Sequence, residues 1–289
     1  MAGALLVVDG PSLLYRSFFA LPESIAAPDG TPVNALLGSA NALLRVVAEH
    51  RPRAVVICSG PDAAAYRVAA YPAYHADRPP VPDGLAPQFA DAPAFFAAFG
   101  WSSESDDEHE ADDLLHSFAL AEEEAGGHAL LLTGDRDLYQ CASARTVVLY
   151  LKTGVKGVEE VDAEEVRRRY GVPPELVPDF IALRGDPSDG LPGARGIGEK
   201  TAADLLRRHG SLEGALAKAL RETPKVRGAL CGQAEELRAF LDIAKLRRLE
   251  VARPADRPSD LPGGAAAARE RGMTRLAERL EQAREVAEL

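Results

Sequence analysis

Acidic side chains directly follow two of the predicted strands, at the point where each strand ends. Asp9 comes after the apolar residues 4–8, and Asp135 and Asp137 come after the apolar residues 129–132. In an open α/β sheet, the carboxyl ends of parallel strands share one edge, where the loops form a ligand-binding crevice. We therefore expect these three carboxylates to lie together, although each one alone also fits an ordinary turn or helix-capping residue.

A further acidic group opens a predicted helix at residues 111–125. Glu110 and Asp113 are three residues apart and share one helix face, whereas Asp112 joins them only if a capping residue shapes the first turn. Acidic residues in a first turn also suit the helix dipole, which is the simpler explanation for any one of them. Other acidic residues nearby are predicted to be solvated surface: Asp106, Asp107, Glu122, Glu123 and Glu124.

Carboxylates that converge need a cation between them. Two of them at 4 Å repel by about 4 kcal/mol at an effective dielectric of 20. Because the sequence offers no Cys/His ligand set, oxygen ligation of Mg²⁺ or Mn²⁺ is the expected chemistry. Two such ions about 4 Å apart would activate water and stabilise the leaving oxygen in phosphodiester cleavage. The acidic residues therefore predict a nuclease site.

The elements that must position these residues alternate between strands and helices. Apolar runs at residues 4–8, 54–58, 129–132 and 146–151 read as buried strands, and helical periodicity recurs at 33–49, 92–99 and 111–125. This alternation predicts an α/β fold with a mostly parallel central sheet flanked by helices. Residues 77–93 carry five prolines and are expected to form an exposed, mobile loop.

After residue 161 the pattern changes to short helices broken by Gly and Pro. We expect three regions: a metal-binding α/β core at 1–161, a helical subdomain at 162–252, and a C-terminal region at 253–289. The C-terminal region is predicted to be a linker followed by one helix at 265–288.

Composition excludes several classes of protein. With 46% hydrophobic and 27% charged residues among 289, the chain is neither disordered nor fibrous. No apolar run approaches the roughly 18 residues of a membrane span, so we expect no membrane contact and no secretory signal. The cysteines Cys58, Cys141 and Cys231 are too few for a disulfide framework, which favours a reducing cytoplasm.

The charge is unevenly distributed along the chain. The net charge is −11, and the first 150 residues hold 20 Asp and Glu against 8 Arg and no Lys. Taken alone, this acidity argues against nucleic-acid binding, which usually comes with a basic excess. The other explanation for local acidity is a group of carboxylates that binds cations.

A glycine-rich string at residues 181–203 contributes Asp186 and Asp189. Within it, Gly196, Ile197 and Gly198 lead into a helix, so free backbone N–H groups and Lys200 would meet a DNA phosphate backbone without reading bases. A Schellman-type helix turn is the alternative for a bare Gly-x-Gly. The whole string is far more specific than that.

Together these motifs resemble the 5′-nuclease superfamily, in particular the 5′→3′ exonuclease domain of bacterial DNA polymerase I, its stand-alone relatives, and flap endonucleases. The resemblance runs from about residue 5 to residue 220. Its markers are Val8-Asp9-Gly10 with Leu14-Tyr15-Arg16, Tyr74-His75-Ala76-Asp77-Arg78-Pro79-Pro80, Glu110-Ala-Asp-Asp113, Thr133-Gly-Asp-Arg-Asp-Leu-Tyr-Gln140 and the string from Gly185 to Lys200.

The resemblance implies roles for the acidic residues. Asp9, Glu110, Asp112 and Asp113 would serve a first metal ion, and Asp135, Asp137, Asp186 and Asp189 would form a second group. The implied cofactor is Mg²⁺ or Mn²⁺, with two ions and no small-molecule cofactor. The implied partner is DNA in which a 5′ single-stranded flap or end joins a duplex, bound by a monomer.

The resemblance also implies roles for the remaining motifs. Arg16 and Arg78, with His75 beside them, would contact the scissile region or flap phosphates. The segment at residues 66–99 corresponds to the arch through which a 5′ single strand passes. The helix-three-turn-helix element would also hold a K⁺ ion, and it would grip the duplex through Gly193, Gly196, Ile197, Gly198, Lys200 and Thr201.

The chain departs from the family pattern at three places. The family has an aspartate at the end of its second strand, and residues 54–60 offer none; the nearest carboxylate is Asp62. His75 stands where the family has a lysine, and Gly190 where it has an asparagine. Imidazole is mostly neutral at pH 7, so the arch loses a fixed charge.

Two other functions remain open at this point. A branched-DNA binding protein with weakened or lost catalysis would explain the missing aspartate and lysine, and Ser59→Asp with His75→Lys would be the restoring change. An RNA-directed nuclease of the related PIN type is the other, although the helix-three-turn-helix motif disfavours it.

Overall fold

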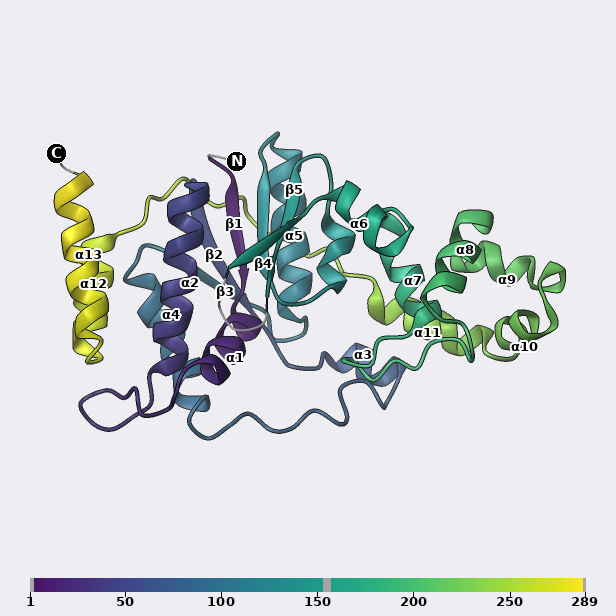
Figure 1. Cartoon of the computed structure of the whole chain (residues 1–289), viewed down its shortest axis with the longest axis horizontal. Helices are drawn as coiled ribbons and strands as arrows, with labels where there is room; N and C mark the ends of the chain where they lie inside the picture. The colour runs from purple at the N-terminus through teal and green to yellow at the C-terminus, as the bar shows by residue number, and fades with distance from the viewer. Residues whose placement is uncertain (1–2, 153–156, 288–289) are drawn as a thin grey trace.

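A mostly parallel six-stranded sheet forms the centre of the molecule in the computed structural model, which describes residues 3–152 and 157–287 (Figure 1). The order is β3-β2-β1-β4-β5-β6, and only β6 is antiparallel to its neighbour. The central strand β1 is buried along its whole length, as expected for a sheet covered on both faces. The strands are β1 (Leu5–Asp9), β2 (Ala54–Ser59), β3 (Ser102–Ser105), β4 (Ala129–Thr133), β5 (Thr146–Leu151) and β6 (Val158–Val161).

Helices from three parts of the chain cover the two faces of the sheet. Alternate residues of β1 and β2 enter different cores, so Val7 and Cys58 pack with α5 whereas Val8 and Ile57 pack with α1 and α2. The α5 helix (Ala111–Glu124) covers the first face. The second face is covered by α1 (Gly10–Ala20), α2 (Asn34–His50) and α4 (Ala86–Ala97). Outside them lie α12 (Leu261–Glu270), which packs against α4, and α13 (Thr274–Ala287), which packs against α12 (Figure 1).

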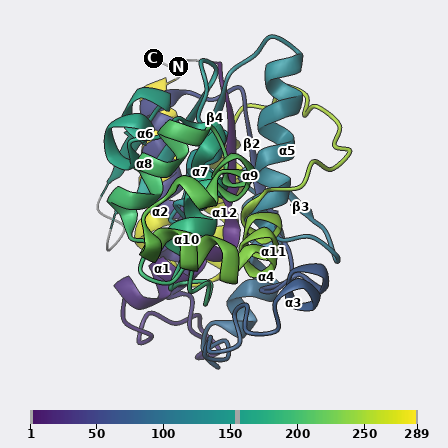
Figure 2. The same ribbon diagram turned by 90° about the vertical axis from the view of Figure 1, so that its right-hand side faces the viewer.

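The helical subdomain extends from the β6 edge of the sheet and lies in front of it in Figure 2. Its core joins that of the α5 face through residues such as Phe180 and Leu205. Tyr71, which follows the short helix α3 (Ala65–Ala70), meets Phe240 with ring centroids 5.0 Å apart. The subdomain contains α6 (Ala163–Tyr170), α7 (Val177–Arg184), α8 (Glu199–His209), α9 (Leu212–Ala217), α10 (Pro224–Gly232), α11 (Ala234–Ala244) and the 3₁₀ turns η2 (Pro174–Leu176) and η3 (Ala219–Arg221).

The fold class and the four long strands predicted from the sequence are confirmed, but two predicted segments are wrong. Residues 86–93 are not loop, because α4 begins at Ala86 and continues through Pro93. The single C-terminal helix is two helices, because Gly272 takes the left-handed conformation at φ 73° and turns the chain. Residue 288 of that prediction lies outside the described residues. The edge strands β3 and β6 escaped prediction because they are short and partly polar.

Glu122 is buried, whereas the sequence predicts it to be solvated surface. It is 0% exposed and pairs with Arg53 and with Arg253, which belongs to the segment returning from the helical subdomain. These pairs lie at the C-terminal end of α5, away from the acidic first turn. Among the described residues, no helix combines the length and apolar character of a membrane span.

Candidate active site

A cavity of about 640 Å³ opens at the carboxyl ends of β1, β2 and β4. One part of its wall is aromatic and apolar, with Tyr15, Val81 and Phe89. The other part is acidic and collects six of the eight carboxylates that the sequence singled out: Asp9, Glu110, Asp112, Asp135, Asp137 and Asp189. The strand-end argument therefore places Asp9, Asp135 and Asp137 correctly beside one another.

Asp9 and Asp135 are fixed by hydrogen bonds at the ends of β1 and β4. One oxygen of Asp9 accepts from Ser12 N at 2.9 Å, so Asp9 also caps α1, and the other accepts from Thr133 Oγ1 at 2.7 Å. Asp135 Oδ1 accepts from the backbone N–H of Asp137, at the start of η1 (Asp137–Cys141), at 2.8 Å. Burial raises the pKa of Asp9, and the bonds from Ser12 and Thr133 offset part of that rise.

Asp112 and Asp137 present carboxylates that accept no hydrogen bond from any described residue. Burial raises the pKa of Asp112 well above its ordinary value, and Asp135 and Asp9 raise it further. The pKa of Asp137 rises for the same reasons, with Asp135 as its main neighbour. Burial also raises the pKa of Asp135 to about 7. This wall is therefore short of positive charge.

This donor set fits hard divalent cations. The groups are buried oxygen ligands with unused lone pairs and mutual repulsion, which Mg²⁺ or Mn²⁺ relieves. In the described part of the chain, no three acidic, His or Cys side chains already stand close enough to form a finished metal cluster.

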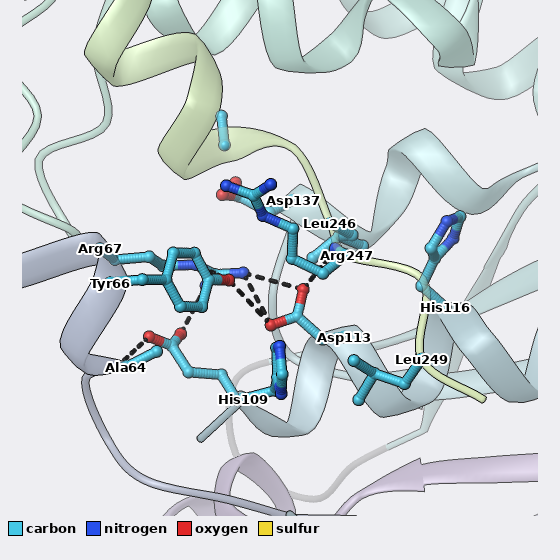
Figure 3. A network of polar contacts seen from close by, with 12 residues as sticks. Ala64, Tyr66, Arg67, His109, Asp113, His116, Asp137, Leu246, Arg247 and Leu249 are labelled. Carbon is cyan, nitrogen blue, oxygen red and sulfur yellow. Dashed lines mark hydrogen bonds and ion pairs between the residues drawn. The ribbon is translucent and has the colours of Figure 1, made fainter. Parts of the chain in front are cut away.

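Glu110 and Asp113 are engaged differently from the other carboxylates. The buried guanidinium of Arg67 donates to Glu110 at 2.6 Å and to Asp113 at 3.1 Å, which Figure 3 shows from close by for Asp113. Asp113 is fully buried, does not line the cavity, and also accepts from Tyr66 Oη and from Arg247 N. The structure thus does not bring Asp113 to the carboxylates that line the cavity, contrary to the sequence-based expectation.

Asp186 and Asp189 lie in the loop after α7. Asp186 is held by Ser188 N at 2.9 Å and by Arg184 at 3.1 Å and does not line the cavity, but its charge raises the pKa of both Asp135 and Asp137. Asp189 lies at the cavity wall and accepts from Arg78 at 3.3 Å.

The arch residues His75 and Arg78 bridge this loop and the loop after β2. His75 takes a left-handed backbone conformation at φ 55°, and its ring lies between the carbonyl oxygen of Asp62 at 2.6 Å and Asp189 Oδ1 at 3.1 Å. Arg78 pairs with Asp62 at 2.9 Å and also lines the cavity. Arg16, in contrast, points to the loop after β4 and donates to Gly134 O at 2.8 Å.

The predicted hairpin joins α7 to α8. Gly193 has φ 68°, and a Cβ there would lie 2.4 Å from Gly185 N, so only glycine fits. Ile197 is buried, and it anchors the loop to the core. Gly196, Gly198 and Lys200 are exposed, Thr201 is half-buried, and no side chain caps the first turn of α8. The open N–H groups of that turn suit a phosphate.

Sequence reasoning missed Arg67, which lines the cavity, and Cys58, which is the buried neighbour of Asp9 in the sheet. Cys58 lies beside Asp9 in the parallel register of β1 and β2 and faces the same side of the sheet, whereas Ser59 alternates to the other side. Burial raises the pKa of the Cys58 thiol, as does the charge of Asp9, so it stays neutral. Strand alternation limits which residues of β2 can face the side of Asp9, but only the register between β1 and β2 identifies Cys58 as its neighbour.

Two family models match consecutive parts of the chain. Residues 4–171 match the N-terminal resolvase-like domain of 5′-3′ exonuclease, and residues 172–257 match its C-terminal SAM fold. The chain belongs to the 5′-3′ exonuclease family. Nuclease activity is the activity of this family, and the matched residues contain the whole cavity wall and the α7–α8 hairpin.

The relatives include both stand-alone exonucleases and polymerases. A 5′-3′ exonuclease of Streptomyces coelicolor is 41% identical over 77% of this chain and 77% of its own length. A 5′-3′ exonuclease of Mycobacterium tuberculosis is 39% identical over 76% of this chain and 74% of its own length. The thermostable DNA polymerase I of Thermus thermophilus is 38% identical over 90% of this chain. This chain spans only about a third of that polymerase, 31% of its length.

Solved structures show the same fold at low identity. A bacteriophage T5 flap endonuclease, in a pseudo-enzyme-product complex with DNA and metal ions, has a TM-score of 0.69 at 18% identity, covering 99% of this chain and 100% of that one. The catalytic core of Rad2 in complex with DNA substrate has a TM-score of 0.61 at 13% identity, covering 96% and 91%.

Proposed function

We propose that this exonuclease depends on divalent metal ions and cleaves DNA where a 5′ single-stranded flap or end joins a duplex, leaving 5′-phosphate products. The observation that carries the proposal is the cavity wall of six carboxylates, of which Asp112 and Asp137 have no donor among the described residues. The T5 flap endonuclease of the same fold was solved with DNA and metal ions, which supports it. The proposal takes the chain as a cytoplasmic monomer.

Metal binding is assigned to the acidic wall. Asp9, Asp112, Asp135 and Asp137 would hold Mg²⁺ or Mn²⁺, with two ions in the working site and Asp186 and Asp189 completing the second group. When bound, the cations supply an activated water and stabilise the leaving oxygen. Thr133 and Ser12 keep Asp9 oriented toward the cavity through its two hydrogen bonds.

Substrate binding is assigned to the arch and the hairpin. Arg78 and His75 would receive the phosphate next to the scissile bond, since both already lie at the cavity beside Asp189. The first turn of α8, with Lys200, would bind the duplex backbone, and the hairpin carbonyls would hold K⁺. Arg16 would act indirectly by supporting the loop after β4.

A 5′-labelled flap duplex tests the proposed function directly. We expect cleavage near the junction in Mg²⁺ or Mn²⁺ and none in EDTA, because Asp9, Asp112, Asp135 and Asp137 form no ion pair with any described residue. A single strand of the same sequence without duplex should be cut more slowly, since the hairpin has nothing to hold. Efficient cutting in EDTA, or equal cutting of the single strand and of a matched RNA flap, would refute the assignment.

The position of Cys58 favours one second candidate, a DNA-binding protein with weakened catalysis. A thiol occupies the place beside Asp9 where a carboxylate would add a hard ligand. We expect Cys58→Asp to strengthen Mn²⁺ binding by about tenfold or more, equivalent to about 1.4 kcal/mol. Isothermal titration of the metal-free protein measures this change.

Ser59→Asp is the matched control, because it adds the same charge one residue on and facing the other side of the sheet. It should leave Mn²⁺ affinity unchanged. Flap cleavage separates the two candidate functions. Cys58→Asp should modestly increase the rate of an active nuclease, whereas it should create cleavage activity in a DNA-binding protein that has lost catalysis. Weaker Mn²⁺ binding in Cys58→Asp would show that this position lies outside the metal site.

A further inference from the structure

Arg67 occupies the centre of a buried network that joins α3 to the first turn of α5. Its side chain is 4% exposed, and it lies at the start of the arch segment. Figure 3 shows Arg67 and Tyr66 reaching across to Asp113. Its guanidinium donates to Glu110, to both oxygens of Asp113, and to the hydroxyls of Tyr66 and Tyr74.

This network uses the lone pairs that a metal ion would need. Each oxygen of Asp113 accepts two hydrogen bonds, from Arg67 and Arg247 N on one side and from Arg67 and Tyr66 on the other. A carboxylate offers about four lone-pair sites, so Asp113 has none left. Glu110 accepts from Ala64 N at 2.7 Å, Arg67 and Tyr74, which leaves it at most one.

The same network determines where Asp112 points. No side chain caps the N-terminus of α5, so its first turn lacks the usual local anchor. The two acidic residues nearest Asp112 in the chain, the N-cap residue Glu110 and Asp113, are instead tied to Arg67 of α3. Asp112 is the one carboxylate of the turn left without a donor among the described residues.

We propose that Arg67 is a positioning residue of the nuclease site, which takes Glu110 and Asp113 as its own ion-pair partners and so presents Asp112 alone to the metal. Glu110 and Asp113 are then supports and not metal ligands in this chain. This inference rests on the proposed function. It also makes Arg67 the link that holds the base of the arch against the acidic wall.

Arg67→Lys is the main test, because lysine keeps the charge but cannot donate to both carboxylates in a fork. Partners that orient metal ligands typically contribute 10- to 100-fold to metal affinity or activity. We expect Arg67→Lys to lower both the Mn²⁺ affinity and the kcat for flap cleavage by about 10- to 100-fold, and to change KM by less than about threefold. Hydrogen exchange of residues 64–74 should also become faster.

Arg53→Lys is the matched control. Arg53, whose side chain is 8% exposed against 4% for Arg67, pairs with Glu122 at the opposite end of α5, so its replacement perturbs the same helix by the same chemical change. It should lower the unfolding temperature about as much as Arg67→Lys does while leaving Mn²⁺ affinity and exchange at 64–74 unchanged. If Arg53→Lys and Arg67→Lys lower the Mn²⁺ affinity equally, then Arg67 has only a general structural role and the inference is overturned.

Asp113→Asn separates a support from a ligand. If Asp113 acts through Arg67, the double variant Arg67→Lys with Asp113→Asn should bind Mn²⁺ no more weakly than the worse single variant, because both remove one interaction. If the loss of Mn²⁺ affinity in the double variant is instead the product of the losses in the two single variants, then Asp113 binds the metal itself and the inference is contradicted. Mn²⁺ titration and hydrogen exchange remain informative even if wild type cuts no flap, which would count against the proposed function alone.

Discussion

Replacing Asp135 and Asp137 together by asparagine should slow flap cleavage by about 10⁴-fold, or about 5.5 kcal/mol of transition-state stabilisation. Both carboxylates face the cavity at the end of β4, and the carboxylate of Asp137 accepts no hydrogen bond from the described residues. Asparagine keeps the shape and the turn but removes two of the charges that would hold the cations. Single-turnover kinetics with a 5′-labelled flap duplex measure the loss.

DNA affinity should not fall with activity in this variant. The duplex contacts are assigned to the α8 hairpin, and removal of two negative charges weakens repulsion of the phosphate backbone. Glu270→Gln with Glu281→Gln is the control, because both glutamates are exposed on α12 and α13. A double asparagine variant that still cuts at more than about a tenth of the wild-type rate would remove Asp135 and Asp137 from the chemistry.

The sequence identifies the strand-end carboxylates because their positions follow from local rules. Asp9, Asp135 and Asp137 each follow an apolar run, and parallel strands bring such positions to one edge. The α7–α8 hairpin is equally local, since Gly193 must be glycine where two backbone segments touch. These parts of the fold and site could be read directly from spacing.

The ion pairs could not be predicted because they join residues far apart in the chain. Arg67 meets Asp113 across 46 residues, and Arg53 meets Glu122 across 69. Spacing on α5 groups Glu110 with Asp113 correctly but cannot reveal that a buried arginine from α3 engages that face. The same limit made Glu122 look solvated, because nothing local indicates the two arginines that bury it.

Mn²⁺ affinity should rise steeply with pH across neutrality. The pKa of Asp135 is about 7, and burial with like charge places those of Asp112 and Asp137 well above their ordinary values. Metal binding requires the ionised forms, so each carboxylate that must lose a proton contributes up to about tenfold per pH unit below its pKa. With two such groups, affinity should increase by about 10²- to 10³-fold between pH 5.5 and 7.5.

The metal-free protein should respond to pH in the opposite direction. Because the folded-state pKa of Asp135 exceeds the ordinary value of 3.8, the native state binds this proton more tightly than the unfolded chain does. Its contribution to the free energy of unfolding is therefore largest at low pH and is lost as pH rises from about 4 to about 7. Saturating Mn²⁺ should reverse the trend, since metal binds the ionised native site.

Calorimetry in two buffers with different ionisation enthalpies measures both effects, because it counts the protons released per metal ion bound. We expect one to two protons at pH 6.5 and fewer at pH 8. The Asp135→Asn variant should release fewer protons per metal ion bound at pH 6.5. Its free energy of unfolding in EDTA should also depend less on pH. Proton release near zero throughout this range would mean that the acidic wall is already ionised without metal, and that its repulsion is not what draws the cation in.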